Sequence, residues 1–274
     1  MAGPVLVRTL KHEYRIAARS EAALQAIAFM ATTPEIAGAA LEPVNLTIEE
    51  RYGFFELKVP GGELVAGTAS VLLAALHGLV WADLLESEAG SPIVHGATVL
   101  GPWGRALLVG FKTSGKTTLA LHLIAAGFQV EGDEHLVIRS DSVIARPRTL
   151  RVKPGSLAMV PSLADAVRIR PFVTAWDGMP IYAVEPSIAG VAWTIAPGRL
   201  DRLVFVEPNH GGRSGMVPMP KPAVLPRLLE ESLLPQAGVP AAFGRLRQLA
   251  MSVPAYRLSL GDLEGAQRCL LRLA

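Results

Sequence analysis

One eight-residue segment constrains the fold and chemistry of this chain more than any other. Residues 110–117 read GFKTSGKT and match the pattern G-x-x-x-x-G-K-T. A short apolar run at residues 106–109 precedes the segment, and a helix-forming stretch at residues 118–126 follows it and ends at Gly127. The predicted order is therefore strand, loop, helix, which is the setting in which this pattern binds nucleotide phosphates.

The fixed positions of the pattern each have a physical reason. The two glycines permit backbone dihedrals that a side chain would forbid, so that successive N–H groups can point at phosphate oxygens. The lysine adds a mobile cation for the β- and γ-phosphates, and the threonine hydroxyl after it can ligate Mg²⁺. The predicted ATP-binding residues are Gly110, Thr113, Ser114, Gly115, Lys116, Thr117 and Thr118.

Composition excludes several other classes of protein. The 274 residues include 26 basic and 24 acidic ones, so the chain is nearly neutral, and no basic run interleaved with aromatics indicates nucleic-acid binding. Cys269 is the single cysteine, which excludes a disulfide framework and a thiolate metal cluster and favours a cytoplasmic protein. We interpret Cys269 as a buried small hydrophobe, not a reactive thiol.

Neither the start of the chain nor its longest apolar stretch indicates a membrane segment. The chain starts without a basic-then-apolar signal segment. The longest apolar stretch, 64–85, is interrupted by Thr68, Ser70, His77 and Asp83, so we interpret it as a buried amphipathic helix and expect no membrane span.

The pattern of elements predicts an α/β fold in two parts. Residues 1–90 are expected to form a small α+β domain, with strands at 5–7, 46–48 and 53–59 and helices at 20–31 and 68–86. Residues 91–274 are expected to form a P-loop domain with a mixed sheet, beginning with a hairpin at 93–100 and 106–109. Further strands are expected at 128–130, 135–139, 142–145, 203–206 and 256–258, with helices at 222–234, 241–252 and 261 to the end.

Phosphoryl transfer also needs a proton acceptor and a second acid for the metal, and the sequence offers candidates for both. Asp133 and Glu134 follow the helix across a short return strand, although a solvated turn would explain them equally well. Glu207 ends an apolar strand and is a rival metal ligand. His95 lies on the strand that leads into the loop, where a lone histidine is more often structural.

A set of basic residues follows these acids. Arg146, Arg148, Arg151 and Lys153 alternate with apolar residues and could clamp a transferring phosphate. We favour the alternative, that they form the solvated face of a strand, with Lys153 as the best exception because Pro154-Gly155-Ser156 would hold it at a loop.

The chain resembles the HPr kinase/phosphorylase family over residues 93–156. The resemblance rests on His95-Gly96, the GFKTSGKT loop, Leu121, Leu123, Gly127 and the acidic pair, whose spacing from Lys116 matches the family's. It implies that Asp133 is the catalytic base, that Glu134 joins Thr117 in holding Mg²⁺, and that His95 contacts and orients Asp133.

The chain also departs from that family. Glu134 stands where the family usually has Asp, residues 111–113 are larger than usual, and the downstream segment used for HPr docking is not found. We therefore expect an ATP- and Mg²⁺-dependent kinase acting on a serine of a protein or peptide other than HPr. A nucleotide-binding regulatory subunit and a small-molecule kinase, for example of free serine, are the alternatives, and homo-oligomerisation is left open.

Overall fold

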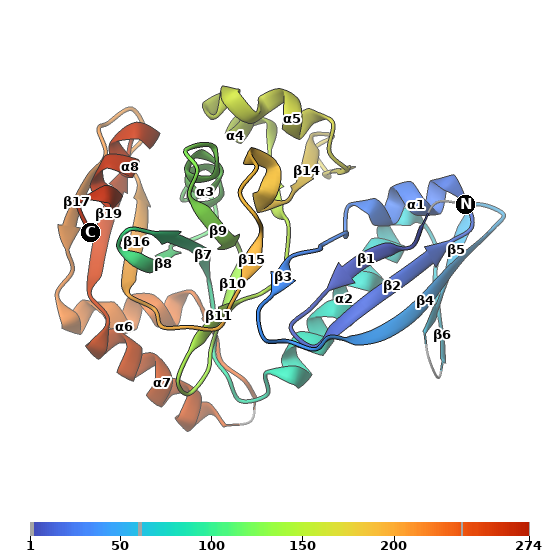
Figure 1. Ribbon diagram of the computed structural model, residues 1–274, viewed down its shortest axis with the longest axis horizontal. Helices are drawn as coiled ribbons and strands as arrows, with labels where there is room; N and C mark the ends of the chain where they lie inside the picture. Colours follow the sequence, from blue (N-terminus) through green and yellow to red (C-terminus); the bar gives the residue numbers. More distant parts are fainter. Residues whose placement is uncertain (1–2, 60–61, 237, 274) are drawn as a thin grey trace.

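The computed structural model describes residues 3–59, 62–236 and 238–273. These residues form a mixed α/β fold with several sheets. The N-terminal part, blue to teal in Figure 1, lies to one side of a larger part that contains the loop at residues 110–115. The mixed α/β architecture expected from the sequence is therefore confirmed. The division of the chain into two separate domains at residue 90 stays a prediction.

The N-terminal part is a sheet covered by two helices. Its strands are β1 (Val5–Arg8), β2 (His12–Ala18), β4 (Glu42–Arg51), β5 (Phe54–Val59) and β6 (Gly62–Ala66), in the order β1-β2-β4-β5-β6. The helices are α1 (Glu21–Ala28) and α2 (Ala69–Ser87). The Ser20 hydroxyl accepts a hydrogen bond from the Ala23 N–H at 3.1 Å, which caps α1 as the sequence predicted.

Helix α2 differs from the buried amphipathic helix expected over residues 64–85. Residues 64–66 belong to β6, and α2 buries only one side, with Leu72, Leu76 and Val80 in the core. Its opposite side exposes apolar residues, including Val71 at 47% and Leu85 at 41%. By length and composition alone α2 could cross a membrane, a property that core helices of soluble proteins share; the absence of a span stays a prediction.

A nine-stranded mixed sheet forms the centre of the larger part. Its main path is β11-β10-β7-β8-β16-β19-β17, with β9 and β18 also paired to β7. The strands are β7 (Ile93–Gly101), β8 (Gly104–Val109), β9 (Gln129–Gly132), β10 (His135–Ile138), β11 (Val143–Ala145), β16 (Arg202–Pro208), β17 (Gly215–Pro218), β18 (Ser232–Leu233) and β19 (Ala255–Leu260). Strands β8, β16 and β19 run parallel and the other pairs are antiparallel, so the expected mixed sheet is confirmed.

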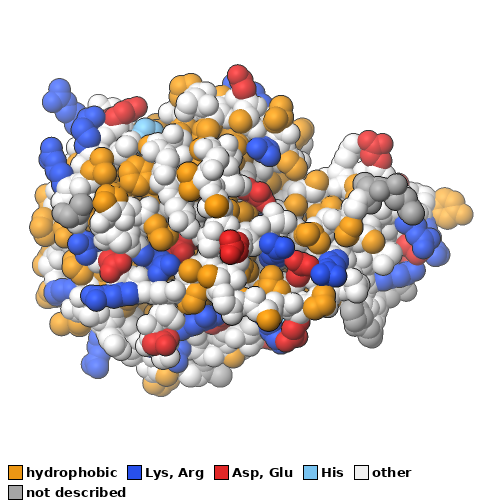
Figure 2. All heavy atoms as spheres, viewed as in Figure 1, with side chains coloured by type: hydrophobic (Ala, Val, Ile, Leu, Met, Phe, Trp, Pro, Cys, Tyr) orange, Lys and Arg blue, Asp and Glu red, His pale blue; other side chains and the backbone are white. Residues whose placement is uncertain are grey.

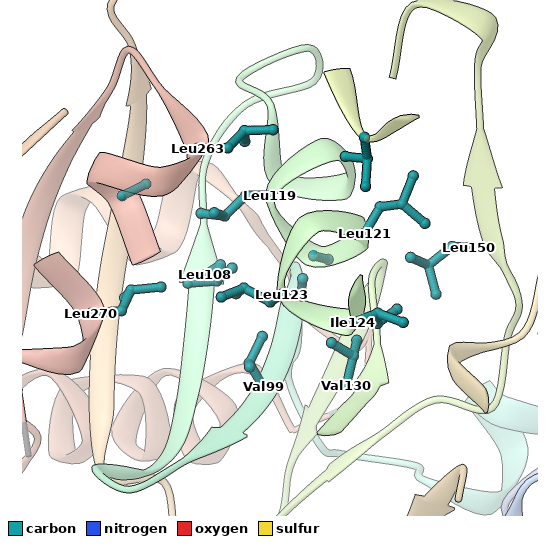
Figure 3. Close-up of a cluster of buried hydrophobic side chains, with 14 of the residues drawn as sticks. Val99, Leu108, Leu119, Leu121, Leu123, Ile124, Val130, Leu150, Leu263 and Leu270 are labelled. Carbon is teal, nitrogen blue, oxygen red and sulfur yellow. The ribbon is translucent and has the colours of Figure 1, made fainter. Parts of the chain in front are cut away.

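Helices cover both faces of this sheet. Figure 1 shows α3 (Lys116–Ala125) and α8 (Leu263–Leu271) on one face and α6 (Lys221–Glu230) and α7 (Val239–Ser252) on the other. Each face has its own apolar cluster. In Figure 3, Leu108 of β8 lies between Leu270 of α8 and Leu123 of α3. All three side chains are fully buried, and truncating one such leucine typically costs about 2–5 kcal/mol, so the loop between β8 and α3 is anchored at both ends.

Residues 150–195 form elements that the sequence patterns did not reveal. They comprise β12 (Leu150–Val152), α4 (Pro154–Met159), η1 (Pro161–Leu163), α5 (Ala164–Arg168), β13 (Phe172–Thr174), β14 (Pro180–Val184), η2 (Pro186–Ala189) and β15 (Thr194–Ile195). Most are too short to show a period. Strand β15 pairs in parallel with β3 (Glu35–Ile36), which joins this region to the N-terminal part.

Candidate functional site

The loop between β8 and α3 requires glycine at two positions for different reasons, a close approach at Gly110 and a positive φ at Gly115. A Cβ atom on Gly110 would lie 2.7 Å from the carbonyl oxygen of Val206 on β16, so only glycine fits there. Gly115 caps α3 with a φ of 95°, and Thr113 has a φ of 74°, a left-handed conformation that strains a β-branched residue. Strained backbone of this kind is held in place by its surroundings and concentrates at functional sites.

Lys116 places its ammonium group at the mouth of the loop. The Nζ atom donates hydrogen bonds to the carbonyl oxygens of Gly110 at 2.5 Å and Phe111 at 3.0 Å. Burial lowers the pKa of Lys116, and the nearby carboxylates of Glu231 and Asp133 oppose that shift. The lysine is therefore a confined cation between the loop and two acids.

Asp133 lies across from the start of α3, in the turn between β9 and β10. Its Oδ2 atom accepts a hydrogen bond from the Thr117 hydroxyl at 3.1 Å, and only 6% of the residue is exposed. Burial raises the pKa of Asp133, although the positive charge of Arg148 and the Thr117 hydrogen bond act in the opposite direction. A buried carboxyl whose pKa is raised is better suited to accept a proton than an exposed one.

Glu134 does not join Thr117 and Asp133, contrary to expectation. Its carboxylate forms an ion pair with Arg148 and lies 3.5 Å from Nδ1 of His135, and it lines a different cavity. The two acids form the bend between β9 and β10, and Asp133 lines one cavity while Glu134 lines another, so neighbours in sequence need not share a site. The rival acid Glu207 is also engaged elsewhere, because its Oε1 accepts a hydrogen bond from Arg227 at 3.1 Å.

His95 faces the same cavity as Asp133 but has another partner. Its Nδ1 atom lies 3.2 Å from Oε2 of Glu231, and its backbone N–H donates to the Glu231 carbonyl oxygen at 2.7 Å. The expected contact of His95 with Asp133 is replaced by this pair. Glu231 follows α6 and reaches the site because β18 pairs with β7. Sequence reasoning missed Glu231, and no local motif marks it.

A cavity of about 490 Å³ connects these groups. This is within the range of small-molecule sites, roughly 300–1,000 Å³. Among the described residues that line it, four are cationic and Asp133 is the one acid. The lining residues are His95, Lys112, Thr113, Gly115, Lys116, Thr117, Thr118, Asp133, Arg151, Lys153, Gly155, Ser156 and Met159. The positive excess is complementary to a polyphosphate.

Two other predicted ATP-binding residues make contacts within the protein. The backbone N–H of Ser114 donates to the Phe111 carbonyl oxygen at 3.1 Å, and the Ser114 side chain is buried. The hydroxyls of Thr118 and Ser156 lie 2.9 Å apart and connect α3 to α4. Ser114 and Gly110 therefore stabilise the conformation of the loop from its buried side, whereas Thr118 lines the cavity.

The arginines after β11 are not the solvated face that we expected. Arg146 is 7% exposed and stacks on the Trp81 ring, with Cζ 4.9 Å from its centroid. Arg151 donates to the Phe29 carbonyl oxygen at 2.9 Å, and its Cζ lies 3.8 Å from the Phe29 ring centroid. Burial lowers the pKa of Arg151 to about 9. The interpretation was wrong because the N-terminal part covers these residues. Lys153 does line the cavity, but Pro154–Ser156 begin α4 and do not form the expected loop, so Lys153 is held there as the N-cap of that helix.

The donor set suits Mg²⁺ bound together with phosphate oxygens. No group of three or more His, Cys, Asp or Glu side chains gathers in the part of the chain that the structure describes. Mg²⁺ usually keeps several waters and takes one or two protein oxygens plus substrate phosphates, which does not require such a group. The Thr117 hydroxyl is an oxygen donor of the required kind.

Comparisons with known proteins include a weak likeness to a solved structure. No family model matches the sequence, and no curated protein matches it. The structure of the Hpr(Ser) kinase/phosphatase from Coxiella burnetii aligns with 10% identity and a TM-score of 0.32, over 66% of this chain and 91% of that chain. A likeness this weak does not establish a family, so function has to be inferred from the chain's own residues.

Proposed function

We propose that this protein transfers the γ-phosphoryl group of ATP to a hydroxyl group, with Mg²⁺ as cofactor, and that the acceptor is a serine of a protein or peptide. The observation that carries the proposal is the buried Asp133 carboxyl at 3.1 Å from the Thr117 hydroxyl, beside a glycine-rich loop with a confined lysine. The raised pKa that burial gives this carboxyl suits it to accept a proton.

Each group has a role in this proposal. Backbone N–H groups of the loop and the start of α3 bind the phosphates, and Lys116 neutralises charge on them. Lys112, Arg151 and Lys153 add positive charge around the cavity. Thr117 would hold Mg²⁺, which supplies further neutralisation of the phosphate charge.

Asp133 accepts the proton of the acceptor hydroxyl as its oxygen bonds to phosphorus and the bond from phosphorus to the ADP oxygen breaks. Glu231, paired with His95 and close to Lys116, takes the place that the sequence gave to Glu134 as the second acid of the site. His95 therefore positions Glu231 in this scheme, not Asp133. The cytoplasmic location expected from the sequence is part of the proposal, because ATP and Mg²⁺ are both available there.

The first test is MgATP binding by calorimetry. Lys116→Ala should weaken binding by roughly tenfold or more, about 1.4 kcal/mol, because it removes the cation at the loop. Lys11→Ala is the matched control, since Lys11 is exposed on the N-terminal part. Unchanged affinity in Lys116→Ala, with an unaltered melting curve, would contradict the phosphate site.

The second test is transfer of labelled γ-phosphate to serine-containing peptides and to free serine. Transfer to peptides supports the proposal, and transfer to free serine alone would make the protein a small-molecule kinase. Binding of MgATP with no transfer to either would instead support a nucleotide-binding regulatory subunit.

A further inference from the structure

A second cavity lies between α2 and the strands after the loop helix, on the other side of the β9–β10 turn from the first. Its volume is about 370 Å³, and it shares no lining residue with the first cavity. Its lining includes His77, Gly78 and Trp81 of α2 and, after β11, Arg146 and Arg148. The site proposed above uses none of these five residues to bind substrate.

The second cavity holds more positive than negative charge. Arg146 and Arg148 share a single carboxylate, that of Glu134: Arg148 forms an ion pair with it, and Nη1 of Arg146 lies 3.8 Å from its Oε2. Across the turn, Arg151 and Asp133 add one charge of each sign. The region therefore contains three guanidinium groups but only two carboxylates. It is largely buried, and an unpaired charge in such a region destabilises the folded protein.

Arg146 has unused capacity to bind a ligand. The residue is 7% exposed, and its Nε atom has no hydrogen-bond partner among the described residues. Its Nη1 lies 3.3 Å from Nδ1 of His135, and its guanidinium stacks on Trp81, which fixes its orientation. Because the Nε atom has almost no accessible surface, a ligand in the cavity would contact the other end of the guanidinium group, and a planar oxyanion is the partner that this group fits best.

His77 completes the lining as a neutral hydrogen-bonding group. Burial and, to a smaller extent, the charges of Arg151, Arg148 and Arg146 together lower its pKa to about 4. At neutral pH its imidazole therefore adds no charge, yet it can donate one hydrogen bond. Gly78, one residue along α2, leaves the entrance open, since a Cβ built there meets no atom within 4 Å.

We propose that this second cavity is a binding site for an oxyanion, a carboxylate or a phosphate group, held by Arg146 and Arg148 with His77 at its side. The site is distinct from the ATP cavity but adjoins it through the Asp133-Glu134 turn. Arg148 forms an ion pair with Glu134 and interacts electrostatically with Asp133. An anion bound to Arg148 would therefore compete with Glu134 for this guanidinium group.

The test uses Lys116→Ala as the parent protein, so that phosphate binding at the loop does not contribute. Inorganic phosphate and acetate are titrated separately by calorimetry. Gly78→Glu in this parent places a carboxylate at the cavity entrance and should weaken binding at least tenfold, whereas Gly78→Ala should leave it unchanged. Alanine and glutamate both have a higher helix propensity than glycine, and residue 78 is exposed, so both variants should fold. Arg146→Leu, which retains an apolar contact for Trp81, should also weaken binding at least tenfold.

The outcomes separate the two sources of the anion. Binding of phosphate alone would identify a free phosphate or phosphorylated ligand, and binding of acetate as well would identify a carboxylate site. No anion binding up to millimolar concentration in the Lys116→Ala parent, or binding that Gly78→Glu and Arg146→Leu both leave unchanged, would overturn the proposal. Neither result depends on whether the protein transfers phosphate, so failure of the proposed function is recognised separately by unchanged MgATP affinity in Lys116→Ala.

Discussion

Asp133→Asn is the substitution that most directly tests the proposed chemistry. Asparagine has the same shape as aspartate, and its amide oxygen can still accept the hydrogen bond that Thr117 donates at 3.1 Å. The loop, Lys116 and the cavity charges remain, so MgATP affinity should change by less than about threefold, or 0.7 kcal/mol. Turnover should fall by roughly a hundredfold or more, because a positioned general base contributes about 10²–10⁴. A hundredfold loss corresponds to about 2.7 kcal/mol of transition-state stabilisation.

The pH dependence of the wild type adds a second readout. The base acts only after losing its proton, so the rate should fall as pH decreases through the Asp133 pKa. Burial raises that pKa above the ordinary aspartate value of about 3.9, and the falling limb should therefore appear at higher pH than for an exposed aspartate. Asp133→Asn should lose this limb.

The assay measures transfer of labelled γ-phosphate to the acceptor found in the peptide screen, beside calorimetric MgATP binding on the same preparations. Asp141→Asn is the matched control, since Asp141 is an exposed acid in the turn at the other end of β10. Turnover in Asp133→Asn within threefold of wild type would refute the base assignment. A loss of MgATP affinity equal to the loss of turnover would instead show that Asp133 acts in binding.

Three further predictions concern the rest of the site. Glu231→Gln should raise the Mg²⁺ concentration needed for half-maximal activity by roughly fivefold, about 1 kcal/mol, whereas Glu134→Gln should leave it unchanged. The reverse result would mean that Glu134, not Glu231, is the second acid of the site. Gly110→Ala should weaken MgATP binding at least tenfold because its Cβ has no space, while Gly155→Ala, which lines the same cavity with open space around it, should bind normally; equal affinities would contradict the loop geometry. Arg151→Lys keeps the charge but loses the guanidinium stack and the hydrogen bond to the end of α1, so it should destabilise the fold by about 1–2 kcal/mol in denaturant unfolding, and a smaller change would mean that the contact between the two parts is weak.

Local pattern determined the elements around the loop. The apolar run before residue 110, the two glycines and the helix formers after residue 116 lie next to one another in the chain, so strand, loop and helix could all be predicted. The hairpin of β7 and β8 was predicted for the same reason, because its turn and both strands are contiguous. Short elements between residues 150 and 195 were missed, because three to five residues are too few to show a period.

Tertiary structure decided which side chains meet at the site. Asp133 and Glu134 are adjacent in sequence, yet the backbone turns one toward Thr117 and the other toward Arg148. Glu231 reaches His95 from 136 positions away through the pairing of β18 with β7, and a contact across that separation has no local signature. The alternating arginines showed the period of a strand, but period alone does not tell which face is covered. The N-terminal part covers them, and so a stretch that reads as solvated surface is buried beside both cavities.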